Sequence, residues 1–468
     1  MTLQYATIID NYSDIVAEEP SSYRCLTERH LQVMWLEQKY FRSLKTREGA
    51  PIHVVSPGCW NAEAGPDFRK AHLVIDGVDY FGDVEIHLFD EGWKQHRHHR
   101  DPNYDNVILH IALWAPKQQQ VIATVSEKPI LCSYFQNAIT IPHSRIVQLI
   151  DLDLYPYERC SGAGRCGETL FRYLSEGKVS SFFRSAARWR LQKKYEHLSA
   201  HSRTAADQAA VGIAAALGYK NNSSAFIDLY HWLCQYRHRD EATLYALALK
   251  GCGFFNEHYQ RLWGANDFYN ELKERVAHIE PHVAVELRMG NIRPHNHPIR
   301  RLAYLSKMIR DPKAALLPVR LRELWDATHH DTRLLWQELV KLIPDYKDDY
   351  WNFHYTFNNH QIETHLPLVG VSLKQEMVIN TFLPILYSYV KDHPDFDAFY
   401  STLATASTGK SRYLSQRFFG DTQKSSLMKR AEIVQGSYQL HHDFCIHYET
   451  SCSGCPFAER YKNFFKIN

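Results

Sequence analysis

The sequence predicts an α+β fold with a mixed α/β core, a large all-α region and a cysteine-rich tail. Three observations lead to this class. Residues 1–155 combine a helical pattern with short apolar runs that are separated by turn signals. Residues 156–440 carry long amphipathic helical patterns, and residues 441–468 hold three closely spaced cysteines. We therefore expect three parts with these boundaries.

The bulk composition indicates an ordinary soluble protein. A chain of 468 residues is long enough for two or three domains. Since no apolar run reaches the roughly 18 residues that span a bilayer and the N-terminus lacks a secretion signal, we expect a cytoplasmic protein without a membrane partner. The net charge of +2 gives no overall attraction to nucleic acid, so any surface that binds it must be local.

The first predicted element is a helix over residues 27–41. Leu31, Met34 and Trp35 fall near one face of this helix, and Thr27 is a suitable N-cap. A short strand follows in the run IHVVS. A helix followed by strands is the beginning of one α/β unit.

A hairpin is predicted over residues 65–87, GPDFRKAHLVIDGVDYFGDVEIH. Its Asp76-Gly77 corner is typical of a tight two-residue turn. Because strand side chains alternate between faces, the apolar residues of the second strand point into a core, while Glu85 and His87 share the opposite face.

A histidine-rich loop, a strand and a second hairpin complete the α/β part. The loop reads WKQHRHHRDPNYD, the strand reads NVILHIALW, and the second hairpin lies in VIATVSEKPILCSYF. After them, stretches such as YLSEGKVSSFFRSAARWRLQKKYEHL predict long helices without an internal repeat of fixed period.

The first hairpin carries a candidate metal site. Asp67 lies in the turn that enters the first strand, and Glu85 lies on the second. If the register brings them together, two carboxylates can hold Mg²⁺ or Mn²⁺. Such an ion activates water for phosphodiester hydrolysis, and His87 could orient that water or move a proton. The alternative is that Asp67 caps a turn and that Glu85 and His87 form a solvated strand face.

Polar side chains crowd the loop after this hairpin. They are His96, Arg97, His98, Arg100 and Asp101. The two arginines could bind phosphate in a forked geometry. The histidines and the aspartate could line the carboxylate site, or they could join His87 as the zinc ligands of a different metallohydrolase. His110 follows on the next strand, and a hydrated loop without chemistry is the remaining interpretation.

The hairpin resembles the core of the PD-(D/E)xK, or restriction-endonuclease-like, nuclease superfamily. Pro66 and Asp67 match the first element of its signature, and residues 85–87 match its acid-x-Lys element. The difference is His87, which stands where the superfamily usually has lysine. The resemblance implies a restriction-endonuclease-like core, with Asp67 and Glu85 as metal ligands.

The same superfamily often carries an acidic residue on its first core helix. Glu28 and Glu37 are the candidates in this chain, and Glu28 is preferred. The resemblance therefore implies a metal-dependent nuclease that acts on DNA or RNA. Because the lysine is replaced, a catalytically inactive scaffold that binds nucleic acid or protein remains open.

A broader resemblance covers nearly the whole chain. The motifs SPGxxNxxAGPDFxxAxLxIxG, GDVEIH and WxxHxHxxDxxYxNVILHI are similar to the domain-of-unknown-function family 2851, which is found in bacteria. LGYKNN, ALALKGCGFF, RPHNHP, WNFHYTF and INTFLPILYSY agree with the same family. The family implies that the three parts form one unit, rather than a particular chemistry.

The tail carries a candidate structural metal site. Cys445, Cys452 and Cys455 have the spacing C-x6-C-x2-C, and a C-x2-C pair can turn two thiolates onto one ion. By the family resemblance the fourth ligand is Cys160, and Cys166 is the second candidate. Thiolates suit Zn²⁺ or a [4Fe-4S] cluster equally. Three histidines could replace a cysteine: His441, His442 and His447.

A basic helix in the all-α region is a candidate nucleic-acid surface. Its cations are Arg184, Arg188, Arg190, Lys193 and Lys194. With Phe and Trp side chains between them, they could hold a phosphate backbone or stack bases. The alternative is an amphipathic helix whose basic residues face water. The sequence leaves the substrate, its strandedness and the oligomeric state open.

Overall fold

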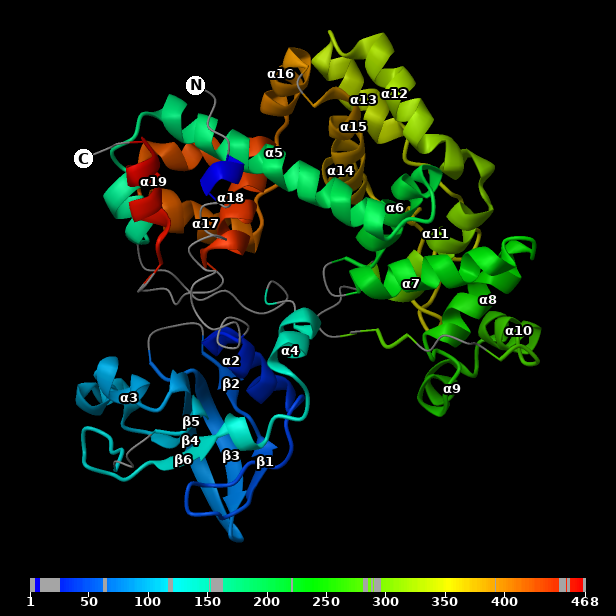
Figure 1. The fold of residues 1–468 in the computed structure, drawn as a ribbon. Helices are drawn as coiled ribbons and strands as arrows, with labels where there is room; N and C mark the ends of the chain where they lie inside the picture. The colour runs from blue at the N-terminus through cyan, green and yellow to red at the C-terminus, as the bar shows by residue number, and fades with distance from the viewer. Residues whose placement is uncertain are drawn as a thin grey trace. The chain divides into compact units, whose positions relative to one another are not determined.

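The computed structural model describes residues 5–8, 26–61, 65–116, 121–150, 152, 163–219, 222–280, 285–287, 289, 296–391, 393–445, 452 and 455–465. Contacts divide the chain into two compact units (Figure 1). The first unit joins the chain up to Ala187 with the chain from Ala404 onward, and the second runs from Arg188 to Leu403. The α/β part, residues 26–150, is called the head below.

The head is built on a mixed sheet (Figure 1). Its strands are β1 (Ile52–Ser56), β2 (Cys59–Trp60), β3 (Phe68–Ile75), β4 (Val78–Phe89), β5 (Val107–Trp114) and β6 (Leu131–Tyr134). The order is β1-β3-β4-β5-β6, and β2 also pairs with β3. The first three strands of this order are antiparallel, whereas β5 is parallel to both β4 and β6. The predicted mixed α/β architecture of the head is confirmed.

Helix α2 (Glu28–Glu37) packs against β4. It begins where the sequence predicts, because Thr27 is its N-cap and donates its backbone N–H to His30 Nδ1 at 3.1 Å. It ends earlier than predicted, at the left-handed Gln38 (φ 52°). Its apolar face, which includes Trp35, forms the main core of the head with the apolar residues of the sheet.

The predicted hairpin is confirmed, with Ile75 paired to Val78 across the corner. Asp76 and Gly77 both have positive φ, 50° and 77°, as a tight turn of this kind requires. The register shifts between Phe68 and Ala71, so Phe68 pairs with Val84. Asp67 therefore lies beside Glu85 at the open end of the hairpin.

The second predicted hairpin forms only as a short antiparallel pairing. Ala123 and Pro129 form one bridge, and it is flanked by hydrogen bonds from Ile130 N to Ile122 O and from Thr124 N to Lys128 O, each 3.0 Å. The segment Leu131–Tyr134 pairs instead with β5 as the parallel strand β6. Its apolar side chains gain more by extending the sheet than a free two-stranded ribbon would allow.

The loop after β4 covers the second face of the sheet. It contains α3 (Gly92–Gln95) and two 3₁₀ turns, η1 (His98–Arg100) and η2 (Pro102–Tyr104). Trp93 and Tyr104 form a small second core with apolar residues of β5 and β6. Beneath it Glu85 is 5% exposed and His87 is 1% exposed. The interpretation of these two residues as a solvated strand face is therefore wrong.

The rest of the first unit is helical. After α4 (His143–Leu149), its elements are the π-helical turn η5 (Gly167–Phe171), the first part of α5 (Glu176–Ala200), α17 (Gly409–Phe419), the 3₁₀ turn η11 (Gln423–Lys429), α18 (Ala431–Asp443) and α19 (Phe457–Phe465). Phe171 packs in one aromatic cluster with Phe182, Phe183 and Phe457. This cluster joins α5 to the C-terminal helices.

Helices are the only regular secondary structure among the described residues of the second unit, and residues 344–370 form an irregular segment of this unit. Its α-helices after α5 are α6 (Gln208–Leu217), α7 (Ser223–Leu233), α8 (Glu241–Gly251), α9 (Glu257–Trp263), α10 (Asp267–Arg275), α11 (Pro298–Arg310), α12 (Leu317–Thr328), α13 (Thr332–Lys341), α14 (Val371–Met377), α15 (Leu383–Val390) and α16 (Pro394–Thr402). None of the described helices combines the length and the apolar character that a membrane crossing needs. The predicted large all-α region is confirmed.

Candidate metal-binding site

The acidic residues of the predicted motif meet at the open end of the hairpin. The backbone N–H of Asp67 donates to Glu85 Oε2 at 3.0 Å. Gln32 of α2 donates to Asp67 Oδ1 at 2.7 Å. The structure thus places Asp67 beside Glu85, but it joins them through the backbone of Asp67, and a shared ion between the two carboxylates stays a prediction.

Two of the acidic residues also accept hydrogen bonds from backbone N–H groups of β4. This strand continues past Val84, its last residue paired with β3, so the amides of Ile86 and Leu88 have no β3 partner. Asp67 Oδ2 accepts from Ile86 N at 3.0 Å, and Glu28 Oε1 accepts from Leu88 N at 3.0 Å. Both carboxylates therefore have a structural role, which does not depend on any ion.

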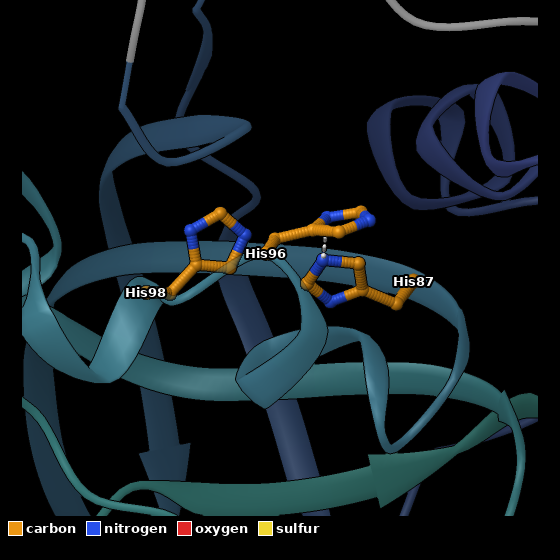
Figure 2. A group of neighbouring side chains, drawn as sticks. All are labelled: His87, His96 and His98. Carbon is orange, nitrogen blue, oxygen red and sulfur yellow. Dashed lines mark hydrogen bonds between the residues drawn. The ribbon is translucent and has the colours of Figure 1, made fainter. Parts of the chain in front are cut away.

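Three histidines converge beside Glu85 (Figure 2). His87 comes from β4, His96 follows α3, and His98 begins η1. One ring nitrogen of each lies within 4.8 Å of the others. His87 Nε2 is 3.1 Å from His96 Nδ1. The loop after β4 thus places the imidazoles of His96 and His98 next to that of His87 on the strand.

Glu85 is the fourth donor of this cluster. Its Oε1 lies 3.2 Å from His98 Nε2 and 3.6 Å from His87 Nε2. In a tetrahedral zinc site with bonds of about 2.05 Å, neighbouring ligand atoms are about 3.3 Å apart. Three of the six separations in this group are 3.1, 3.2 and 3.6 Å, which bracket this value, and the histidine nitrogens all lie within 4.8 Å of one another.

A chain of buried polar groups supports His87 from behind. His87 Nδ1 lies 2.9 Å from His110 Nε2, and His110 Nδ1 lies 3.8 Å from Asp90 Oδ1. Tyr134 donates its hydroxyl to the same oxygen of Asp90 at 3.0 Å. If His87 donates from Nδ1 to His110 Nε2, the lone pair of His87 Nε2 faces the cluster. Such backing partners fix the tautomer of metal-ligating histidines.

Burial disfavours the protonated forms of His87 and His110. Burial, with smaller contributions from His110 and the other two histidines, holds the pKa of His87 well below its usual value. The pKa of His110 falls to about 3, mainly through burial and then through His98. Burial also raises the pKa of Asp90, and it raises the pKa of the nearby Cys132 thiol to about 12. Neutral histidine is the form that binds metal, whereas a protonated thiol such as Cys132 is a poor ligand.

The cluster opens to solvent on the side of the loop. His96 is exposed, unlike His87 and His98. Arg97 and Arg100 lie on the same loop and are also exposed. Two exposed cations therefore lie within four residues of His96 in the chain.

Asp101 and Glu37 lie outside the cluster. Asp101 caps the turn η2, where its Oδ1 accepts from Asn103 N at 2.9 Å. Glu37 pairs with Lys39 at 3.5 Å near the end of α2. The proposed zinc set of three histidines therefore has Glu85 rather than Asp101 beside it.

The basic residues of α5 are engaged inside the protein. Arg184 pairs with Glu432 at 2.9 Å, and Arg188 forms a forked ion pair with Asp397. Lys193 pairs with Glu196 and lies over Trp189, and Lys194 bonds Asn380. Arg190 is half-buried on the same helix. These contacts favour the amphipathic interpretation, and nucleic-acid binding by this helix stays a prediction.

The cysteines of the tail meet Cys166 at one cavity. Cys166 stands directly before η5, Cys445 follows α18, and Cys452 and Cys455 precede α19. The preferred partner, Cys160, lies outside the described residues, as does His447. His441 and His442 belong to α18 and do not line the cavity.

Sequence reasoning missed several members of these sites. Asp90 and Tyr134 carry no motif, and only the parallel pairing of β6 with β5 brings Tyr134 to the histidines. A further group in the second unit joins His329, His393 and Asp395. Because His393 Nδ1 accepts from Asp395 N as the cap of α16, this group has a structural explanation.

Comparisons with known proteins give one family. The profile of a family described as "Protein of unknown function (DUF2851)" matches residues 28–408. No curated protein and no solved structure matches the chain. The matched range begins at the first residue of α2 and contains the whole histidine cluster, whereas the three C-terminal cysteines lie beyond it.

Proposed function

Because the chain belongs to the DUF2851 family, whose description assigns no activity, we propose a function from the geometry of the site. The head is a metal-dependent hydrolase of phosphate esters, and nucleic acid is the substrate class that we propose. A divalent transition metal, with zinc as first candidate, is held by Glu85, His87, His96 and His98.

One observation carries the proposal: one ring nitrogen of each of His87, His96 and His98 lies within 4.8 Å of the others, and Glu85 Oε1 lies 3.2 Å from the nitrogen of His98 and 3.6 Å from that of His87. Imidazole suits zinc, iron, copper and nickel better than magnesium. Buried polar groups at such distances would be expensive to assemble without a ligand or a complete hydrogen-bond network.

The chemistry follows from this ligand set. A bound zinc ion lowers the pKa of its water to about 7 and so supplies hydroxide at neutral pH. Held by these residues, the ion would supply hydroxide for the cleavage of a phosphodiester, in which one water is consumed to give a phosphomonoester and an alcohol. His110 holds the orientation of His87, and the exposed Arg97 and Arg100 attract the anionic substrate.

A second candidate keeps the restriction-endonuclease-like interpretation. In it, Mg²⁺ or Mn²⁺ binds Asp67 and Glu85 with help from Glu28, and His87 replaces the usual lysine. The contact of 3.0 Å between Asp67 N and Glu85 supports it, as does the order of a helix, antiparallel strands and a parallel strand. The hydrogen bonds of Asp67 and Glu28 to β4 amides favour the histidine centre instead.

The test is metal analysis together with cleavage. We expect the purified chain to lose one equivalent of transition metal in His96→Ala, whose side chain is exposed and contributes little to packing. His99→Ala is the matched control, because His99 lies on the same loop but outside the cluster. Cleavage of a simple phosphodiester, and of single- and double-stranded DNA and RNA, should fall with the metal.

Asp67→Asn separates the two candidates. If the histidine centre is catalytic, this variant keeps its transition metal and most of its cleavage. Loss of Mg²⁺-dependent cleavage in Asp67→Asn, with cleavage unaffected in His96→Ala, would establish the carboxylate site instead. A metal content that is equal in all variants, with no cleavage, would leave only the inactive scaffold.

A further inference from the structure

Four thiols from three separate segments line one cavity in the first unit. They are Cys166, Cys445, Cys452 and Cys455. Electrostatic interaction couples Cys166 with Cys452 and Cys455, and couples Cys445 with the other three. The cavity is otherwise lined by Tyr413, Phe444, Phe457, Ala458 and two arginines, and no carboxylate is among its described lining residues.

The backbone around the cavity is arranged for this meeting. Cys455 N donates to Cys452 O at 3.2 Å, so the C-x2-C pair closes as a turn, with Cys452 at a positive φ of 56°. Gly164 N donates to Arg417 O at 2.7 Å, which fixes the chain before Cys166 to α17. Backbone hydrogen bonds therefore fix the pair Cys452 and Cys455 and the chain beside Cys166.

A buried cation faces these sulfurs. Arg417 is 4% exposed, and its Nη2 donates to Cys452 Sγ at 2.6 Å. Arg165 lines the same cavity and donates to Cys455 O at 3.5 Å. A centre with four thiolates carries excess negative charge, and hydrogen bonds to its sulfurs are the usual means by which a protein stabilises it.

We propose that Cys166, Cys445, Cys452 and Cys455 bind one metal centre, with Arg417 donating to the thiolate of Cys452. The centre is a tetrathiolate site whose spacing suits a [4Fe-4S] cluster better than a single Zn²⁺ ion, because no three of the four sulfurs lie within 4.8 Å of one another. It is independent of the histidine site of the head. Its role is to tie the chain before α5 to α17 and to the C-terminal segment.

The first experiment counts metal in the intact chain, purified without oxygen. Iron with equal acid-labile sulfide and visible absorption identifies the cluster, and a colourless protein with zinc identifies the single ion. Either result supports the site, provided that it persists in the His96→Ala variant, which lacks the histidine-bound metal. A His96→Ala protein with neither zinc nor iron would overturn the proposal.

The second experiment maps the ligands without a variant that could misfold. Alkylation by iodoacetamide, read by mass spectrometry, should spare the four proposed cysteines until a chelator removes the metal. Cys59 is exposed and should react throughout. Equal reactivity of the four cysteines with and without chelator contradicts the proposal.

Variants then choose between the two upstream cysteines. We expect Cys166→Ser to lose the metal and Cys160→Ser to keep it. The reverse result would show that Cys160 is the ligand and that the proposed set is wrong. Arg417→Met should keep the metal but release it to a competing chelator faster, by about 10-fold or more, as is usual for the loss of an outer partner.

Discussion

His87 is fixed by neighbours on several sides at once. His110 lies against its Nδ1, His96 lies against its Nε2, and Gly92 lies against the ring itself. Glycine is needed at position 92, because a side chain there would occupy the space of the His87 imidazole. A Cβ on Gly92 would lie 2.7 Å from Cγ and Cδ2 of His87.

We therefore expect Gly92→Ala to move the His87 ring and to weaken metal binding by about 10- to 100-fold, the range that is common when the support of a ligand is lost. Competition with a chromogenic chelator measures the affinity. Gly177→Ala is the control, since nothing lies within 4 Å of a Cβ added there. Equal affinities in the two variants would mean that His87 does not bind the metal.

At the scale of elements, short sequence patterns predict helix caps and tight turns, because these features depend on a few neighbouring residues. Thr27 marks the start of α2, and Asp76-Gly77 marks the hairpin, because a cap and a tight turn are properties of a few neighbouring residues. Alternation along β4 predicts that Glu85 and His87 share a face, but it does not reveal that a later loop buries this face. The pairing of β6 with β5 is equally non-local.

Helix α11 offers a test of buried histidine at this scale. His297 caps the helix, with Nδ1 accepting from Ile299 N at 3.4 Å, and packs near Phe254 and Trp263. Burial lowers its pKa to about 4. The unfolded chain takes up this proton near pH 6.5 and the folded chain near pH 4. Below pH 6.5 the unfolded state therefore binds more protons, and the free energy of unfolding falls as the pH falls.

For His297→Asn we expect the free energy of unfolding to fall less steeply as the pH decreases, because asparagine can cap the helix but does not titrate in this range. The slope of the free energy of unfolding between pH 6.5 and pH 4 should decrease by up to about 1.4 kcal/mol per pH unit. Urea unfolding of both proteins at pH 7, 6 and 5 gives the comparison. Parallel pH profiles would show that the folded protein binds this proton as readily as the unfolded chain.

At the scale of the whole molecule, the chain returns to its first unit after completing the second. Residues from Ala404 onward belong with the chain up to Ala187, and the segment from Arg188 to Leu403 has a unit of its own. The composition predicts several domains, but it does not predict that α17 and α18 join the first unit. The tail cysteines depend on this return, because Cys166 and Arg417 approach each other only through it.

Removal of the thiolate-bound metal should therefore loosen one unit and spare the other. We expect faster hydrogen exchange in α17, α18 and α19 after chelation, with α8 and α11 unchanged. Mass spectrometry of peptic peptides resolves these helices. A uniform increase through both units would show that they unfold as one cooperative body.

The difference in length between the neighbouring strands β3 and β4 has a consequence for protein design. Strand β4 extends beyond the last residue that pairs with β3. The backbone N–H groups of Ile86 and Leu88 therefore need other acceptors, which Asp67 and Glu28 supply. Lengthening β3 by two residues would let backbone carbonyls take over those amides. Asp67 and Glu28 would then no longer be needed for folding. Substitution of either residue in such a variant would test its role in catalysis alone.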